Sequence, residues 1–412
     1  MRRGTILLLA ACLAALLLAV ASAQAATSCQ QMRSWLGSGG SANGLLVVDT
    51  ASGQTICASA PERQRVLASN TKLFTTAAAL SQLGPQTRIP TRIFADGSLD
   101  PNGVLRGSLY LKGGGDPTLG TPAFTSSYLA GQGTNLFALT PQIRTAGIES
   151  ITGRVYADAT IFDNLRGVAD SGYATSPYIG PLSGLSFNAG FNGSTSSSGF
   201  SADPAKLAAA KLARSLGNAG VRVPSQVALA PTPPHADQIA VVRSPTIDQI
   251  VNVTDVYSNN FFAETLVKLL GARLGTAGTT AAGTAVVEQF ARDHGSGISA
   301  SDGSGLTRSN RASPRQVVDL LLAMREDPAG ENFIQDLALS GKEGTVDDRL
   351  GGTAYGRCRV KTGTLTGVSA LSGYCFNTSG RIMAFSILMN GVSSTSSAHL
   401  YQDRIASAIA GY

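Results

Sequence analysis

The feature that most constrains the fold is a change of character after the first long helix. That helix opens near residues 67–80, and Gly84 and Pro85 end it. From about Arg88 to Pro245, short β-rich runs alternate with loops rich in Gly, Pro and Ser, and long helical patterns return only afterwards. This order predicts a domain of mixed α/β (α+β) class. An inserted, mainly β region of one or two subdomains interrupts that domain. We place the domain at 27–90 plus 245–412, and the insertion at 91–244.

Within this frame, local patterns predict the individual elements. A short helix is expected at 28–36, followed by a hairpin around Ala51-Ser52-Gly53. Within the insertion, only the stretch around "DPAKLAAAKLARSLGNAG" is strongly helical. Further elements are expected towards the C-terminus: helices at 246–273, 278–294 and 313–326, strands around Lys361, a strand "RIMAFSILMN", and a final helix "SAHLYQDRIASAIAG".

The N-terminus indicates export. Arg2 and Arg3 precede an apolar run from Ile6 to Ala21, which small residues follow. This is the pattern of a secretory signal peptide, so we expect residues 1–25 to be removed. No later segment reaches the roughly 18 consecutive apolar residues of a membrane span. We therefore expect no transmembrane span after signal removal, and a periplasmic or cell-wall-associated location.

Four cysteines remain after the signal, and an oxidising compartment permits disulfides. Cys358 and Cys375 are equidistant from a turn near Thr366-Gly367, which would place them opposite one another on an antiparallel pair of strands. This pairing leaves Cys29 with Cys57. Neither pair has the spacing of a redox motif or a zinc site.

Composition excludes several classes of function. The formal net charge is +6, and the basic residues are dispersed, with no run that suggests nucleic-acid binding. Only three histidines are present, and they are scattered along the chain. We therefore expect no metal site, no cofactor and no nucleic-acid partner.

Ser69 and Lys72 form the first candidate for chemistry. Three residues apart on a helix, their side chains share one face. A serine hydroxyl needs a neighbouring base, and a lysine can serve when burial lowers its pKa. The chain has 25 arginines and only 7 lysines, and an arginine could not act as the base. The alternative is a polar helix N-terminus in which Ser69 is a cap.

A second candidate is "RVKTGTL", where Lys361, Thr362 and Gly363 lie in a predicted strand. The cation and hydroxyl suit a substrate carboxylate, and the glycine allows close approach of another backbone. The N–H of Thr364 and that of Ser69 could hold an oxyanion together. An ordinary hairpin bend is the competing interpretation.

The third candidate is Ser258 with Asn260, an S-x-N pattern at the start of a predicted helix. By pattern alone it is weak, because Ser41-Ala42-Asn43 and Ser186-Phe187-Asn188 match as well. Its place between the other two motifs favours Ser258. The hydroxyl could relay protons, and the Asn260 amide could bind a substrate carbonyl.

The order S-x-x-K, S-x-N, K-T-G in an exported chain is the serine penicillin-recognising signature. The chain resembles the class C low-molecular-mass penicillin-binding proteins, the D-alanyl-D-alanine carboxypeptidase/endopeptidases of peptidase family S13. Four further stretches resemble that family's blocks in the same order: "YLKGGGDPTL" (110–119), "PLSGLSFN" (181–188), "SDGSGLTRSNRASP" (301–314) and "GKEGTVDDRLGGT" (341–353).

The resemblance implies a serine β-lactamase/DD-transpeptidase-like fold with an insertion after the first long helix. It implies that Ser69 is the acylated nucleophile, Lys72 its general base, and Ser258 and Asn260 the groups for proton relay and substrate placement. Lys361 and Thr362 would hold the terminal D-alanine carboxylate, with Gly363 giving clearance. The expected partners are peptidoglycan stem peptides, with β-lactams as inhibitors.

Two alternatives to this function remain. A β-lactamase on the same scaffold would need a base for fast deacylation, and Glu264 and Glu343 are candidates that nothing in the sequence singles out. A non-catalytic peptidoglycan-binding protein could also keep the fold.

For "SDGSGLTR", which contains Asp302 and Ser304, we expect a structural role.

Overall fold

The computed structural model describes residues 28–129 and 131–412, and the expected signal peptide lies outside them. The chain forms two compact units. The first runs to Asn70 and adds Arg311–Ala323 and Leu337–Tyr412; the second comprises Thr71–Asn310 and Met324–Asp336. The predicted serine and its lysine therefore fall in different units, joined through the peptide bond between Asn70 and Thr71.

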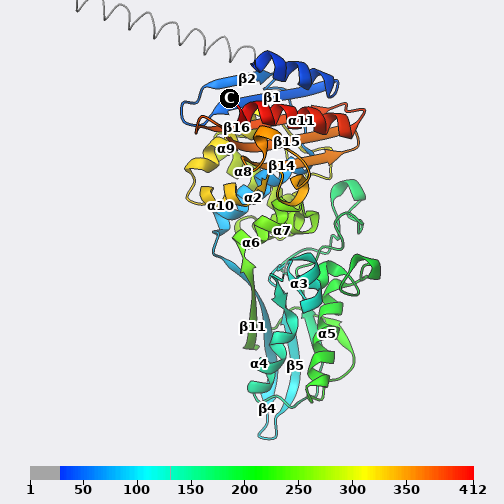
Figure 1. The fold of residues 1–412 in the computed structure, drawn as a ribbon. Helices are drawn as coiled ribbons and strands as arrows, with labels where there is room; N and C mark the ends of the chain where they lie inside the picture. Colours follow the sequence, from blue (N-terminus) through cyan, green and yellow to red (C-terminus); the bar gives the residue numbers. More distant parts are fainter. Residues whose placement is uncertain (1–27, 130) are drawn as a thin grey trace, which may run out of the picture. The chain divides into compact units, whose positions relative to one another are not determined.

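The first unit is built on a six-stranded antiparallel sheet with the strand order β13-β14-β15-β16-β1-β2 (Figure 1). Its central strands are apolar and almost wholly buried, as in a sheet that is covered on both faces. The elements of this unit are a helix at 28–38, β1 (Ala42–Asp49), β2 (Thr55–Ser59), β3 (Arg65–Val66), the 3₁₀ turn η1 (Ala68–Asn70), β12 (Arg311–Ala312), most of α9 (Pro314–Glu326), β13 (Ala338–Leu339), η6 (Gly344–Val346), η7 (Gly352–Ala354), β14 (Cys358–Leu365), β15 (Val368–Phe376), β16 (Ile382–Asn390) and α11 (Thr395–Ala410).

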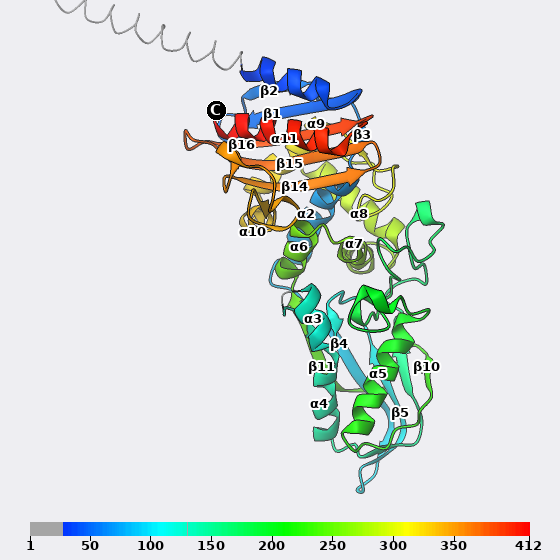
Figure 2. The same cartoon turned by 45° about the vertical axis from the view of Figure 1, so that its right-hand side comes forward.

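Two helices cover one side of this sheet. The amphipathic helix 28–38 contributes Met32 and Leu36 to the core, and α11 contributes Ile405 and Ile409. Figure 2 shows α11 in front of this sheet, and the strands that it contacts are β14, β15 and β16. The helix at 28–38 and α11, from opposite ends of the described chain, thus pack on the same sheet. The first unit is therefore complete only when the residues after 336 have joined it.

Both predicted disulfides are present. Cys358 and Cys375 are directly opposite in the register of β14 and β15, as the position of the turn required. Cys29 and Cys57 join the N-terminal helix to β2.

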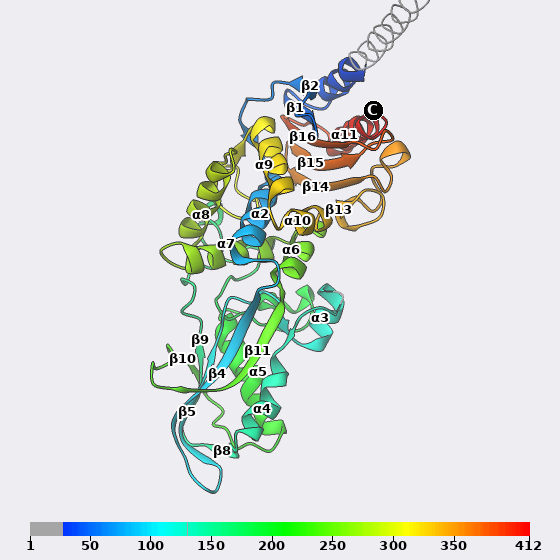
Figure 3. The same ribbon diagram turned by 90° about the vertical axis from the view of Figure 1, so that its left-hand side faces the viewer.

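The second unit contains a helical part grouped around α2 (Thr71–Leu83). This helix contacts α6 (Ile247–Val256), α7 (Asn260–Leu274) and α8 (Thr280–Asp293), and Figure 3 shows it among them. Ten of its thirteen residues are buried, so its apolar sequence reflects contact on all sides. A short helix, α10 (Gly330–Gln335), also packs on it.

The same unit contains the inserted sheet, with the order β10-β9-β5-β4-β11. β4 follows α2 directly, and β11 leads back into α6. Apolar faces of α4 and α5 pack on the sheet and form one core with it. The remaining elements of this part are β4 (Arg88–Leu99), β5 (Val104–Lys112), β6 (Leu119–Gly120), α3 (Pro122–Tyr128), β7 (Thr134–Asn135), η2 (Leu136–Ala138), α4 (Leu139–Thr145), β8 (Ser150–Ile151), β9 (Val155–Asp158), η3 (Ala169–Ser171), η4 (Asn188–Gly190), η5 (Ser196–Ser198), α5 (Pro204–Asn218), β10 (Val227–Leu229) and β11 (Asp237–Thr246).

Two predictions about elements are wrong. The expected helix 246–273 is two helices, α6 and α7, because the chain turns at Tyr257–Asn259. The insertion also contains the short helices α3 and α4 besides α5. The domain bounds 27–90 plus 245–412 and 91–244 stay a prediction.

Candidate active site

Ser69 lies at the centre of the tight turn η1, immediately before α2, and is half-buried. The preceding Ala68 has φ +48°, a left-handed conformation that is unfavourable for a residue with a Cβ. Such strain persists where the surroundings fix the backbone, and it is concentrated at functional sites. The serine therefore does not occupy an ordinary N-cap position.

Asn70 fixes this turn to the sheet of the first unit. Its Nδ2 donates to the carbonyl oxygen of Lys361 at 2.9 Å, and its Oδ1 accepts from Oγ of Ser372 at 2.6 Å. Asn70 is fully buried, so losing either partner would leave a polar group without compensation. Asn70 was not among the predicted site residues, because its partners lie about 300 residues away.

Gly363 of the K-T-G strand lies directly against the turn. A Cβ at this position would be 2.9 Å from the carbonyl oxygen of Leu67 and 3.0 Å from the backbone nitrogen of Ser69. Only glycine allows the two backbones to approach this closely. The structure thus brings the serine and the K-T-G motif together within one unit.

The other residues of this motif differ in exposure. Lys361 is completely buried, and its Nζ donates to the carbonyl oxygen of Thr362 at 3.0 Å. The Oγ1 of Thr362 donates to Oγ1 of Thr345, and Thr364 is exposed. Since β13 pairs only with Arg359 and Val360, none of the described strands pairs with the outer edge of β14 from Lys361 onward.

Lys72 belongs to the second unit, in the first turn of α2. Its side chain is completely buried. Nζ donates to Oδ1 of Asn260 at 2.7 Å and to the carbonyl oxygen of Ser304 at 2.7 Å. The structure thereby brings Lys72 together with the S-x-N motif and with the "SDGS" loop.

The S-x-N motif occupies the turn between α6 and α7. Asn259 caps α7 by accepting from the N–H of Phe262, and Asn260 is the first helical residue. The amide of Asn260 also donates to the carbonyl oxygen of Tyr178 at 3.0 Å. Ser258 has φ +56°, so this turn is strained at the predicted relay residue.

The buried carboxyl of Glu264 holds the loop that contacts Lys72. Its Oε1 accepts from the N–H groups of Gly303 and Ser304 at 3.1 and 2.7 Å. Burial, and secondly the nearby Asp302 carboxylate, raise the pKa of Glu264 to about 8. The carbonyl of Ser304 therefore has a fixed direction towards Lys72, a contact that the sequence analysis did not predict.

Comparison with known proteins decides which family this arrangement represents. The sequence profile of the D-Ala-D-Ala carboxypeptidase 3 (S13) family matches residues 36–199 and 193–410. The chain belongs to the S13 family. A D-alanyl-D-alanine carboxypeptidase of Actinomadura sp. (strain R39) is 30% identical to this S13 chain over 90% of its length and 82% of the relative's. The carboxypeptidase Rv3627c of Mycobacterium tuberculosis is 29% identical over 84% and 75%.

Solved structures show the same fold. Penicillin-binding protein 4 (DacB) from Haemophilus influenzae superimposes with a TM-score of 0.80 at 18% identity, covering 92% of the S13 chain and 99% of that structure. A predatory peptidoglycan endopeptidase from Bdellovibrio bacteriovorus has a TM-score of 0.54 at 18% identity, with 88% and 90% covered. The predicted α/β DD-peptidase-like fold is confirmed.

Two structural findings concern what else this S13 chain contains. In residues 28–129 and 131–412, no group of three or more His, Cys, Asp or Glu side chains is arranged to hold a metal ion. Across the same ranges, every helix is too short or too polar to cross a bilayer.

Proposed function

We propose that the chain is an exported serine DD-peptidase that cleaves the D-Ala-D-Ala bond of peptidoglycan stem peptides through an acyl-enzyme on Ser69. The observation that carries this proposal is the contact between the Ser69 turn and Gly363. It joins the turn that contains Ser69, strained at Ala68, to the strand with the K-T-G motif, in a chain of the S13 family. Export follows from the signal-peptide pattern of residues 1–25.

Lys72 has the contacts expected of a general base. A neutral amine carries two N–H groups and one lone pair. The oxygens of Asn260 and Ser304 accept the two N–H groups. We assign the lone pair to the Ser69 proton because the motif places the two residues three positions apart.

The chemical steps follow from this assignment. Oγ of Ser69 attacks the carbonyl carbon of the penultimate D-alanine while its proton passes to Lys72. The N–H groups of Ser69 and Thr364 stabilise the oxyanion. The C–N bond then breaks, and the leaving D-alanine amine receives a proton from Lys72 through Ser258. Water finally attacks the ester, which releases the shortened peptide and restores the Ser69 hydroxyl.

The outer edge of β14 suits the substrate peptide. An extended peptide can add to an unpaired strand edge through backbone hydrogen bonds. The Thr362 hydroxyl can turn from Thr345 and donate to the terminal carboxylate together with that of Thr364, and we assign Lys361 of the same strand to hold this carboxylate as well. The same chemistry would cleave D-alanine cross-links, and β-lactams should acylate Ser69 as substrate mimics.

A β-lactamase would need a further base for deacylation, and the two candidate carboxyls are otherwise engaged. Glu264 holds the Gly303–Ser304 backbone, and Glu343 pairs with Arg359 at 2.9 Å. A non-catalytic peptidoglycan-binding protein would not need a buried, doubly hydrogen-bonded Lys72.

The deciding experiment is incubation with benzylpenicillin, followed by intact-mass measurement and peptide mapping. We expect one adduct, on the peptide that contains Ser69, and none in Ser69→Ala. Ser41→Ala is the matched control, because Ser41 also matches S-x-N and should leave labelling unchanged. Labelling of Ser69→Ala would contradict the proposal. Steady hydrolysis of a chromogenic cephalosporin would indicate a β-lactamase, and binding to sacculi without an adduct would indicate a binding protein.

A further inference from the structure

The second unit contains a pocket of about 400 Å³ near the junction of α2 and β4. Four of its ten lining residues are arginines, Arg88, Arg92, Arg243 and Arg273, and none is acidic. The pocket shares no residue with the proposed peptidase site. Its volume lies within the usual range of small-ligand pockets, roughly 300–1,000 Å³.

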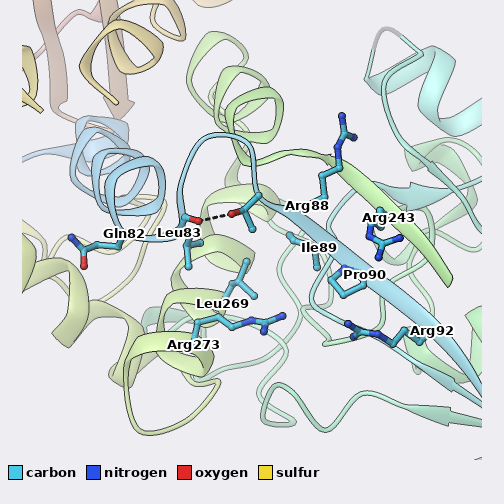
Figure 4. Close-up of a pocket in the computed structure, with 10 residues that line it drawn as sticks. Gln82, Leu83, Arg88, Ile89, Pro90, Arg92, Arg243, Leu269 and Arg273 are labelled. Atoms are coloured by element: carbon cyan, nitrogen blue, oxygen red, sulfur yellow. Dashed lines mark hydrogen bonds between the residues drawn. The ribbon is translucent and has the colours of Figure 1, made fainter. Parts of the chain in front are cut away.

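The strand geometry places three of these arginines on one face. Arg88 and Arg92 are separated by an even number of residues on β4, so they share a face with Pro90. Arg243 of β11 is directly opposite Pro90 in the register, so it projects from that face too. Figure 4 shows Arg273, from the last turn of α7, and Arg92 pointing towards one another, whereas Arg88 extends away from them.

Within the described part of the chain, the positive charge of these arginines is not paired with a carboxylate at ion-pair distance. Of the ion pairs that the described residues form, none includes Arg92, Arg243 or Arg273. Burial lowers the pKa of Arg92, and the charges of Arg273 and Arg243 lower it further. Arg92 is therefore repelled by both Arg243 and Arg273, a cost that a bound anion would remove.

A purely structural role could account for any one of these arginines, but it does not account for their grouping around one pocket. Arginine stems can cover apolar lining such as Leu269, and a cation in the last turn of a helix is favourable. Neither effect requires three such side chains around one pocket without a carboxylate.

We propose that this pocket binds a ligand that carries adjacent phosphate groups, with Arg92, Arg243 and Arg273 as the recognising residues. The planar guanidinium group donates two parallel hydrogen bonds to a phosphate. Three such groups around one pocket match a ligand with two or more closely spaced negative charges. The phosphates could belong to a free oligophosphate, a phosphodiester polymer or a lipid headgroup, and the chemistry of recognition is the same.

The test uses the purified protein and inorganic tripolyphosphate in isothermal titration calorimetry. We expect one site per chain, affinity that falls as salt is raised, and much weaker binding of citrate, a tricarboxylate. In the double variant Arg92→Gln/Arg273→Gln, binding should weaken by at least about tenfold for each arginine removed. Arg214→Gln is the matched control, because Arg214 is an exposed arginine on α5 outside the pocket, and it should leave binding unchanged.

Thermal unfolding provides a second readout that is independent of peptidase activity. Tripolyphosphate should raise the Tm of the wild type and leave that of the double variant unchanged. Without ligand, the double variant should unfold at the same temperature or higher, since repulsion is relieved. Equal affinity in the double variant, equal binding of citrate, or no binding at all would each overturn the proposal.

The source of the phosphates is separated by two further probes. A glycerol-phosphate oligomer tests a phosphodiester polymer, and vesicles containing phosphatidylglycerol test a lipid surface. The source is identified by the probe that competes with tripolyphosphate for the wild type. That probe should also fail to bind the double variant. Penicillin labelling of Ser69 should be normal in the double variant, so failure of this proposal is distinguishable from failure of the proposed function.

Discussion

Nζ of Lys72 lies 2.7 Å from Oδ1 of Asn260, a residue 188 positions further along the chain. This hydrogen bond connects the first and second motifs of the predicted signature directly. It also uses the oxygen of the Asn260 amide, so the nitrogen is the end that contacts the carbonyl of Tyr178. The asparagine thus orients the lysine and a neighbouring loop at once.

Replacing Lys72 by arginine should abolish its function as a base while keeping a positive charge. Because arginine stays protonated, we expect benzylpenicillin acylation of Ser69 to slow by about 10²–10⁴-fold. Stopped-flow or quenched mass spectrometry measures the rate. Lys206→Arg, on the exposed face of α5, is the control and should react normally. Acylation of Lys72→Arg within threefold of wild type would show that Lys72 is not the base.

Gly363→Ala should move the turn that contains Ser69 away from β14. The new Cβ has no room beside the backbones of Leu67 and Ser69, so one of them must shift. Since small misplacements of reacting groups can cost about 10²-fold, we expect acylation to slow by that order, with a stability loss of about 1–3 kcal/mol. Gly217→Ala, which meets nothing within 4 Å in α5, should affect neither quantity adversely. Normal acylation in Gly363→Ala would argue against the close approach as a requirement.

Glu264 should make stability depend on pH. Burial and Asp302 raise its pKa from an ordinary value of 4.5 to about 8. The folded chain therefore holds this proton more tightly than the unfolded chain. The resulting stabilisation is complete below about pH 4.5 and is lost progressively as the pH rises to about 8.

We expect Glu264→Gln to reduce the fall in Tm between pH 5 and pH 8, because glutamine keeps an oxygen for Gly303 and Ser304 and does not ionise. Some dependence should remain, since burial also raises the pKa of Asp302. Glu343→Gln removes a partly exposed carboxyl that pairs with Arg359, and should leave the slope unchanged. An identical slope in Glu264→Gln and wild type would contradict this assignment.

The parts of the site that the sequence predicted are those with local causes. The turn at Thr366-Gly367 determines the register that pairs Cys358 with Cys375, and a one-residue slip would have reversed every side chain of the strand. The S-x-N motif at Ser258 was singled out because an apolar run follows it, although the helix itself was expected to begin at 246. These patterns are complete within a few residues.

What the sequence could not predict depends on contacts across the chain. Asn70 is an ordinary polar residue until Lys361 and Ser372 lie beside it. Glu264 lies in an apolar helix, and only the fold shows that it binds the loop at 303–304. The break before α7 was missed because apolar residues continue on both sides of it, and a strained Ser258 leaves no trace in hydrophobic periodicity.

Ser258 allows activity and stability to be separated by two substitutions. Its φ of +56° disfavours any side chain with a Cβ by about 1–2 kcal/mol, and glycine is free of that cost. We expect Ser258→Gly to stabilise the fold by about 1 kcal/mol and Ser258→Ala to give no gain. Both remove the hydroxyl, so both should slow D-alanine release by about 10²-fold or more if Ser258 relays the proton.

Chemical denaturation and a D-alanine release assay measure the two effects in parallel. A more stable but less active Ser258→Gly would show that the strained turn is retained for its chemistry. If Ser258→Ala and Ser258→Gly unfold at the same denaturant concentration, the left-handed backbone carries no strain in solution. If both release D-alanine at the wild-type rate, the proton reaches the leaving amine from Lys72 without Ser258.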